Sequence, residues 1–327
     1  MTSYLSIKIR VISFVMMILV VILHANIIHM SVGASRLVQM VFTDEYTRIA
    51  VPLFFLISGY LLFLNCDGSW EFFRQKMLRR IKTLVVPYLI LTIIGGIIWA
   101  ISKGTGIIET VINSVLLSPK LFYQLWFLHD LILMVYLSPL FFYIFKKTPY
   151  LWAFICYFWI TGHYWEILNF ESFFFWGVGG IIALQAPAMA EQNWGESNPI
   201  IVGLFVVWIC TSTFIIYTEE RSFWIHGSNI LLGIFVAWGI YDITPPSVIR
   251  FLTQSNYLSY SFFLYLFHEP ILTGYKKSML TILELNQFTS MIIYIVSPIL
   301  TLCTILLVGQ FAKRHTPIIY HVITGNR

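Results

Sequence analysis

KIRVISFVMMILVVILHAN, residues Lys8 to Asn26, is an apolar run that follows basic residues and carries one imidazole, His24, near its far end. About twenty apolar residues span the hydrocarbon core of a bilayer as an α-helix, so the stretch predicts a transmembrane helix. At 1.5 Å of rise per residue, His24 lies inside the apolar layer, in the half farther from the N-terminus. An ionisable side chain at that depth is energetically costly and indicates a functional site.

The rest of the chain has the composition of a multi-pass membrane protein. Of its 327 residues, 58% are hydrophobic and 11% are charged, against roughly a quarter charged in a soluble domain. We therefore predict an all-α helix bundle with one integral membrane domain over residues 1–327 and no nucleic-acid partner. The four cysteines show no CxxC or Cys/His spacing, so neither a disulfide framework nor a metal site is expected.

Apolar runs bounded by charges, turn residues or proline predict ten transmembrane helices. An even number places both termini on one side of the membrane. Cytoplasmic segments collect Lys and Arg, and thirteen of the 20 such residues fall on the side of the termini. We therefore expect both termini in the cytoplasm, in a cell's inner (cytoplasmic) membrane. The expected helices cover about residues 9–31, 49–65, 82–101, 121–145, 150–168, 171–186, 198–217, 224–241, 256–274 and 289–311.

Three of these helices carry titratable groups at a similar depth. His24 lies in the outer half of the first, the pair His129 and Asp130 in the fourth, and the pair His268 and Glu269 in the ninth. A lone intramembrane histidine is often only hydrogen-bonded to a neighbouring helix, which is an equal alternative for His129. The shared depth favours function for His24, His268 and Asp130. Further polar residues at the outer helix ends are Arg48 and Glu166, together with three expected to be solvated, His163, Glu171 and His226.

RQKMLRRIK, residues Arg74 to Lys82, is the densest basic cluster and is expected to form a cytoplasmic loop. One interpretation is that it only sets the topology beside anionic lipid. The other is that it binds a phosphorylated ligand through charge-assisted hydrogen bonds.

Five patterns in the chain resemble the acyltransferase-3 family of integral membrane O-acyltransferases, in the family's order. They are VVILH (Val20 to His24), VPLFFLISGYLL (Val51 to Leu62), RRIKTLVVPYL (Arg79 to Leu89), LWFLHDLILMVYLSPL (Leu125 to Leu140) and LSYSFFLYLFHEPIL (Leu258 to Leu272). The chain is most similar to glycan O-acetylases that consist of the membrane domain alone. The resemblance implies a bundle of about ten helices. It also implies transfer of an acyl group, usually acetyl from cytoplasmic acetyl-CoA, to a hydroxyl of an exported, cell-surface or lipid-linked glycan.

The family's marker is an arginine followed by ten residues and then a histidine on the first helix. Here Ser13 stands at the arginine position, and the nearest arginine, Arg10, lies about one turn earlier. The acyl donor would then be contacted either by Arg10, which lies on roughly the same helix face, or by Arg79 and Arg80. The residues expected around acetyl-CoA are therefore Arg10, Ser13, Arg74, Arg79, Arg80 and Lys82.

Acyl transfer to an alcohol needs a base that works near neutral pH, and imidazole suits this role. His24 is the predicted base, with Asp130 or Glu269 to orient its ring and His268 as a further catalytic candidate. The chain has no GxSxG nucleophile motif, which favours direct attack of the sugar hydroxyl on the thioester over an acyl-histidine intermediate. The acceptor is expected to bind from outside, at Arg48, Trp126, His129 and Glu166.

A transporter or flippase of a lipid-linked glycan is the alternative from another class. It would use the same buried polar groups as a substrate path and would need no CoA. Discontinuous helices in paired halves would favour it, and the sequence shows no such pairing. A membrane sensor without chemistry is a third reading. The sequence leaves open the acceptor sugar, the choice between acetyl and succinyl, and the oligomeric state.

Overall fold

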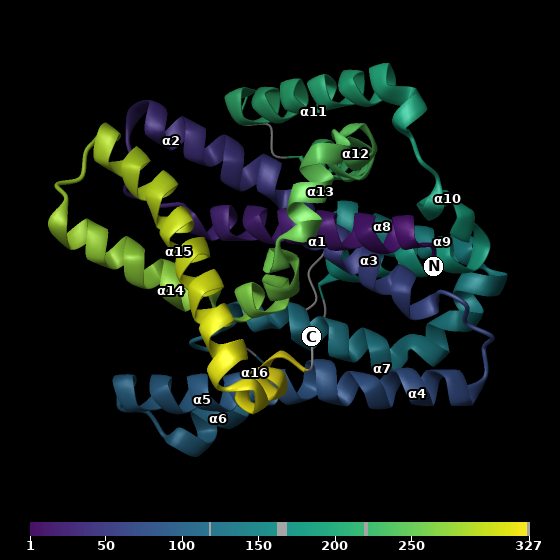
Figure 1. Ribbon diagram of the computed structural model, residues 1–327, viewed down its shortest axis with the longest axis horizontal. Coiled ribbons are helices and arrows are strands. Elements are labelled where there is room, and N and C mark those ends of the chain that lie inside the picture. Colours follow the sequence, from purple (N-terminus) through teal and green to yellow (C-terminus); the bar gives the residue numbers. More distant parts are fainter. Residues whose placement is uncertain (118, 162–168, 219–221, 326–327) are drawn as a thin grey trace.

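The computed structural model describes residues 1–117, 119–161, 169–218 and 222–325, and in these ranges it is a bundle of helices without β-strands (Figure 1). A helix satisfies its own backbone hydrogen bonds, which lipid requires of a spanning segment. The helices are α1 (Ser3–Ala25), α2 (Gly33–Met40), α3 (Ala50–Phe63), α4 (Trp70–Arg80), α5 (Val86–Lys103), α6 (Ile107–Leu116), α7 (Trp126–Lys147), α8 (Trp152–Ile160), α9 (Phe170–Gln185), α10 (Pro187–Glu191), α11 (Asn198–Thr218), α12 (Phe223–Ile243), α13 (Pro246–Gln254), α14 (Ser261–Ile282), α15 (Gln287–His315) and α16 (Pro317–Thr324).

Seven of the ten expected spans coincide with helices long and apolar enough to cross a membrane. The expected spans 150–168 and 171–186 correspond to shorter apolar helices, Pro149–Ile160 and Phe170–Gln185. The expected span 256–274 corresponds to α14, which has 22 residues and carries Glu269 and two lysines. The protein is therefore a multi-pass helical membrane protein, while the count of ten and the side of the termini stay predictions.

The basic segment Arg74 to Lys82 is helical, which corrects the expectation of a loop. α4, the π-helical turn η3 (Ile81–Val85) and α5 follow one another without a break from Trp70 to Lys103, along the lower edge of the molecule in Figure 1. Ser69 caps the start by accepting a hydrogen bond from the Phe72 N–H at 3.1 Å. This continuous helix is longer than a bilayer core requires.

The segment before α3 is also helical, although it was expected to lie outside the spans. α2 leads into a second π-helical turn, η1 (Val41–Glu45), then into the 3₁₀ turn η2 (Tyr46–Ile49) and α3. π-Helical turns are rare and often occur at functional sites. Each of the two turns here lies within a few residues of an arginine that becomes important below, Arg48 or Arg80.

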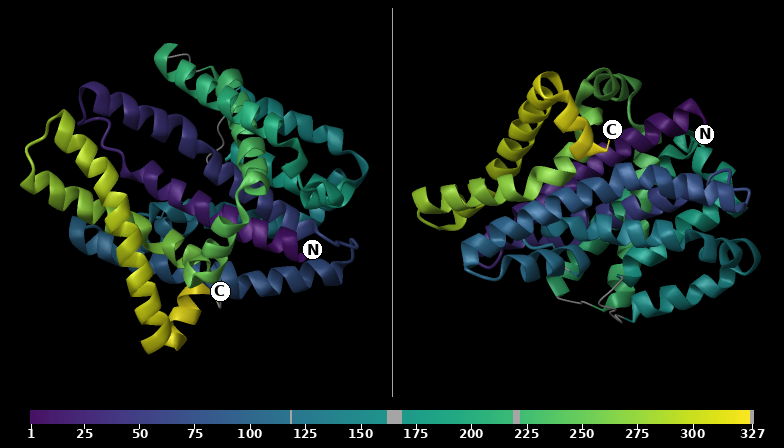
Figure 2. Two further views of the ribbon diagram at one scale, coloured as in Figure 1. Left: turned by 45° about the horizontal axis from the view of Figure 1, so that its top comes forward. Right: turned by 90° about the horizontal axis from the view of Figure 1, so that it is seen from below.

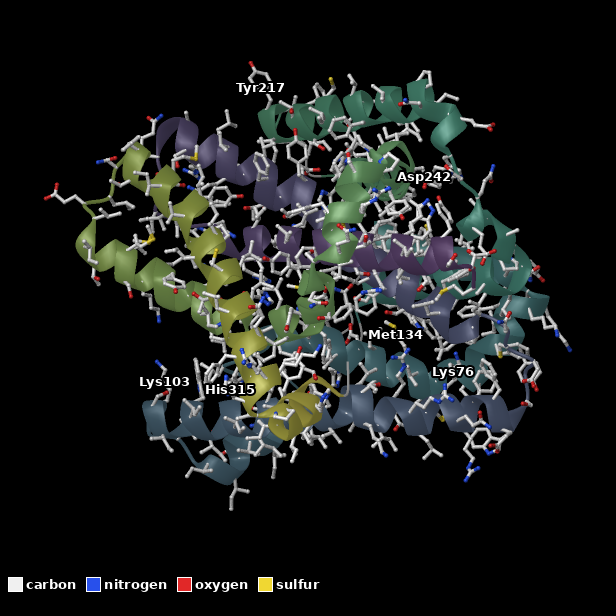
Figure 3. All side chains as sticks on the ribbon, viewed as in Figure 1. Lys76, Lys103, Met134, Tyr217, Asp242 and His315 are labelled. Carbon is white, nitrogen blue, oxygen red and sulfur yellow. The ribbon has the colours of Figure 1, made fainter. Side chains whose placement is uncertain are left out.

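α1 runs through the middle of the molecule (Figure 1), where it packs against α3, α14 and α15. Near its start, the Lys8 side chain is fully buried and its Nζ lies 2.7 Å from Oδ2 of Asp242, in the last turn of α12 (Figure 3). The Tyr4 hydroxyl also donates to Asp242, and the Trp194 N–H donates to it at 3.0 Å. Lys8 is one of the thirteen basic residues that were counted on the side of the termini, and it is part of a buried ion pair between α1 and α12.

α3 and α9 make the closest helix contact of the bundle core because both present glycine to the other. A Cβ added at Gly59 would lie 1.9 Å from the carbonyl oxygen of Trp176, and one added at Gly179 would lie 2.0 Å from that of Leu56. Small residues at a membrane helix interface permit this approach of the two backbones. At the other side of the molecule, α15 and α16 form a V-shaped pair (Figure 2), and α16 packs back against α5.

Candidate functional site

A cavity of about 520 Å³ follows one face of α1, a volume in the range of small-molecule sites. The α1 residues that line it recur every three or four positions, as expected for one helix face: Ile9, Ser13, Met17, Val20, Leu23 and His24. From Ile9 to His24 the helix rises about 22 Å. α3 lines the same cavity from Val51 to Leu62, so the cavity connects two distant levels of the bundle.

An arginine lies at each end of this cavity. Arg80, at the end of α4, and Leu84, in the π-helical turn after it, line the end near Leu62. Lys76, one turn before Arg80, donates to the Leu61 carbonyl at 3.2 Å, which anchors α4 to that end of α3. Arg48, just before α3, lines the other end. The sequence pattern assigned both arginines to binding, and the fold puts them at opposite ends of one cavity.

His24 lines the Arg48 end of the cavity and is held by two other elements. Its Nδ1 lies 2.7 Å from the hydroxyl of Tyr123, in the 3₁₀ turn before α7. The Tyr123 hydroxyl in turn interacts with the Glu269 carboxylate on α14. Glu269 also accepts a hydrogen bond from Thr273 Oγ1 at 2.7 Å. The expected carboxylate thus reaches His24 through a tyrosine and not directly.

Two more α14 residues contact His24. Lys276 Nζ donates to the His24 carbonyl at 2.5 Å, and so satisfies a carbonyl at the end of α1 that has no partner within the helix. The ring of His268 lies 5.4 Å from that of His24 between centroids. His268 is fully buried, and its Nδ1 lies 2.8 Å from the Tyr265 carbonyl. The four side chains Tyr123, His268, Glu269 and Lys276 with His24 are called the His24 cluster below.

Asp130, the other expected orienting carboxylate, lies with a different set of partners. Its Oδ1 is 3.5 Å from His129 Nδ1, and it interacts with the hydroxyl of Ser172 on α9. Asp130 is buried, but among the described residues that line the cavity are its neighbours Leu128 and Leu131 and neither Asp130 nor His129. In the described structure this pair is therefore not part of the cavity wall.

The expected donor residues separate into two groups. Ser13 and Arg80 line the cavity. Arg10 was expected on roughly the same helix face as Ser13, but it is exposed and is not among the described lining residues, whereas its neighbour Ile9 is. Arg74, Arg79 and Lys82 are exposed as well, and Arg74 pairs with Glu71 at 3.2 Å. Of the two alternatives for the missing marker arginine, the geometry favours Arg80.

The expected acceptor residues separate in the same way. Arg48 and Trp126 line the cavity, and Arg48 makes an ion pair with Asp44 at 3.7 Å. His129 does not line it in the described structure, and Glu166, like His163, lies outside the described residues. Glu171, expected to be a solvated rim residue, instead lines the cavity and accepts a hydrogen bond from Trp159 Nε1 at 2.9 Å.

A buried polar network behind Arg48 was not expected from the sequence. Glu45, in the π-helical turn η1, accepts a hydrogen bond from Asn229 Nδ2 at 2.6 Å and lies 3.2 Å from His226 Nδ1. Asn229 also donates to Ser212 Oγ at 2.9 Å. The network fixes η1 to α11 and α12, and so fixes the chain three residues before Arg48. Glu45 follows Asp44 in a stretch that was expected to lie between two spans. No feature of the sequence there predicts that the Glu45 side chain is buried.

Tyr123 and Lys276 were missed for a related reason. Tyrosine and lysine are common at the ends of membrane helices, where they contact the interface. Their positions in the sequence therefore do not indicate a functional role. Only the tertiary packing of α14 and of the 3₁₀ turn η4 (Tyr123–Leu125) brings these two side chains to His24. In the described part of the chain, no group of three or more His, Cys, Asp or Glu residues has an arrangement that would hold a metal ion.

Comparison with known proteins gives one match. A family model described as an acyltransferase domain matches residues 8–309, nearly the whole chain. No curated protein and no solved structure matches the chain.

Proposed function

Because the chain belongs to the acyltransferase-3 family, and so is a membrane acyltransferase, we propose that it transfers an acetyl group from cytoplasmic acetyl-CoA to a hydroxyl of an exported or cell-surface glycan, with His24 as the general base. One observation carries this proposal. The cavity that His24 lines continues along α1 to Ser13 and Arg80, so a donor and an acceptor can enter from opposite sides and meet at one imidazole.

The donor half of the proposal rests on length and charge. CoA carries phosphates, which Arg80 would hold at one end of the cavity. The rise of about 22 Å along α1 is comparable to an extended pantetheine arm, so the thioester would lie near His24. Met17, Val20 and Leu131 line the intervening wall and suit the apolar stem of that arm. In this proposal the Arg80 end and both termini face the cytoplasm of a cell with the protein in its inner membrane.

The His24 cluster supports the role of base through its hydrogen-bond directions. If the Tyr123 hydroxyl donates to the Glu269 carboxylate, its oxygen accepts from Nδ1–H of His24. That tautomer leaves Nε2 with a lone pair, as a general base requires. The arrangement resembles in function the carboxylate that orients a catalytic histidine, with a tyrosine between the two.

The reaction proceeds in two steps, addition of the acceptor hydroxyl to the thioester and breakdown of the resulting tetrahedral intermediate. His24 Nε2 takes the proton of the acceptor hydroxyl as its oxygen bonds to the thioester carbonyl carbon. The C–S bond then breaks, and the departing CoA sulfur takes the proton back from the imidazolium. The products are the O-acetylated glycan and CoA thiol, without a net change in protons. Arg48, which is close enough to His24 to interact electrostatically, would stabilise the negative charge on the intermediate oxygen.

Thiol release by the purified protein tests this function. Wild-type protein in nanodiscs is mixed with acetyl-CoA and a panel of glycosides, and free CoA and acetylated sugar are measured together. We expect His24→Ala to abolish both products while the exposed His29→Ala variant keeps them. A well-folded His24→Ala protein that still acetylates would refute the base assignment. Movement of a lipid-linked glycan across the membrane without thiol release would instead favour the transporter.

A further inference from the structure

We propose that Glu171 binds the acceptor at the His24 end of the cavity and selects a sugar ring without negative charge. This inference rests on the proposed function and adds the chemical class of the ring that enters. It is carried by the position of Glu171 in the cavity wall, the contacts that fix its carboxylate, and the charges around it.

The local sequence fixes Glu171 firmly. It is the second residue of α9, and Asn169 caps that helix by accepting a hydrogen bond from the Glu171 N–H at 2.9 Å. Trp159, which is only 4% exposed, donates its indole N–H to Oε2 at 2.9 Å. Asn169 and Glu171 both line the cavity. A carboxylate held in this way presents acceptor oxygens in a constant direction, which a flexible surface glutamate does not.

Glu171 lies at the same end of the cavity as His24. Arg48 interacts electrostatically with both residues, and all three line the cavity. Trp126, which begins α7 directly after the turn that carries Tyr123, lines it too. An aromatic ring and a carboxylate in the wall of one cavity are suitable for binding a sugar, since the ring covers C–H groups and the carboxylate accepts from hydroxyls.

The charges at this end of the cavity argue for a neutral ring. Arg48 has Asp44 as its ion-pair partner at 3.7 Å. The Lys276 ammonium donates to the His24 carbonyl and also interacts electrostatically with Glu269. His226 faces Glu171 from α12, but its Nδ1 already lies 3.2 Å from the buried Glu45. Among the described residues, each of these two cations therefore has a carboxylate in its surroundings, and Glu171 adds a further negative charge. A carboxylate on the acceptor would be repelled by the Glu171 carboxylate, because two like charges a few ångströms apart oppose binding.

Acetylation of matched glycosides tests the inference. The full-length protein in nanodiscs is given acetyl-CoA with the methyl glycosides of glucose, galactose and mannose, and with the corresponding methyl uronides, which replace the CH₂OH group by a carboxylate. We expect the wild type to prefer the neutral members. Glu171→Gln should raise KM for the preferred neutral sugar about tenfold, the cost of one charge-assisted hydrogen bond. It should also reduce the ratio of kcat/KM between that neutral sugar and its uronide.

Two controls separate a binding role from a structural one. KM for acetyl-CoA should be unchanged in Glu171→Gln, and the exposed Glu109→Gln on α6 should behave as wild type. If the wild type acetylates none of the six glycosides, the proposed glycan acceptor fails and the inference fails with it. If the wild type acetylates them but prefers uronides, or if Glu171→Gln keeps both KM and the preference, the inference alone is overturned.

Discussion

The hydroxyl oxygen of Tyr123 lies 2.7 Å from Nδ1 of His24, across ninety-nine residues of sequence. The contact joins the turn before α7 to the end of α1, and the Glu269 carboxylate on α14 completes it from the other side. Three separate segments thus meet at one nitrogen of the His24 imidazole. The candidate base depends on this arrangement as much as on the histidine itself.

Tyr123→Phe should lower kcat about 10- to 100-fold, which is less than the roughly 10²–10⁴-fold that a positioned acid or base contributes, because His24 itself is kept. The phenyl ring keeps the packing, while His24 loses the acceptor that fixes its tautomer. Steady-state acetylation at saturating acetyl-CoA measures the change, and KM for acetyl-CoA should stay the same. Tyr136→Phe, at an exposed position on α7, is the control.

Glu269→Gln should act through the same contact, so its effect should not add to that of Tyr123→Phe. Residues in one hydrogen-bond network couple, whereas distant residues contribute independently. The measurement is a double-mutant cycle on kcat. A double variant whose loss equals the product of the two single losses would show that Glu269 and Tyr123 act separately.

Arg80→Gln should raise KM for acetyl-CoA about tenfold or more, because it removes a charge-assisted contact to phosphate. Arg74→Gln is the matched control, since Arg74 belongs to the same helix but is exposed and paired with Glu71. Initial rates over a range of acetyl-CoA concentrations distinguish the two. Equal KM values for acetyl-CoA in the two variants would show that the basic segment only sets the topology.

The Lys8–Asp242 pair predicts an unusual pattern of stability. Lys8→Met leaves the Asp242 carboxylate buried without its cation, and removal of one partner of such a pair costs about 3–5 kcal/mol. The double variant Lys8→Met with Asp242→Leu removes both charges and should recover much of the loss. Thermal unfolding in detergent should rank the single variant below the double variant, and the reverse order would contradict this account.

Gly59→Ala should prevent correct packing of α3 on α9. The added methyl group would lie 1.9 Å from the backbone oxygen of Trp176, which has no side-chain freedom to move away. The cavity between α1 and α3 would change with that contact, so both the yield of folded protein and activity should fall. Gly203→Ala on α11 is the control, since a Cβ there meets nothing within 4 Å. Similar yields for the two variants would show that the interface can relax.

The membrane class, most of the long helices and the face of α1 were accessible from sequence, because apolar length and helical spacing are local properties. His24 and Ser13 share a face by their spacing, and both line the cavity. The same argument did not distinguish Arg10 from Arg80, or Asp130 from Glu269. Which of these residues lie near the cavity or near His24 depends on how the helices are rotated about their axes when they pack. A local sequence pattern does not determine that rotation.

The sequence by itself determined that this chain is a helical membrane protein with titratable groups, His24 among them, inside the apolar layer. Hydrophobic length and an ionisable residue within an apolar run are local features, so they can be read without knowing the neighbouring helices. Only the tertiary structure decided what surrounds that imidazole: Tyr123 between His24 and Glu269, Lys276 on the end of α1, and Glu171 in the cavity wall. Those contacts come from segments far apart in the chain, and their positions follow from how the helices pack, including the glycine contact between α3 and α9.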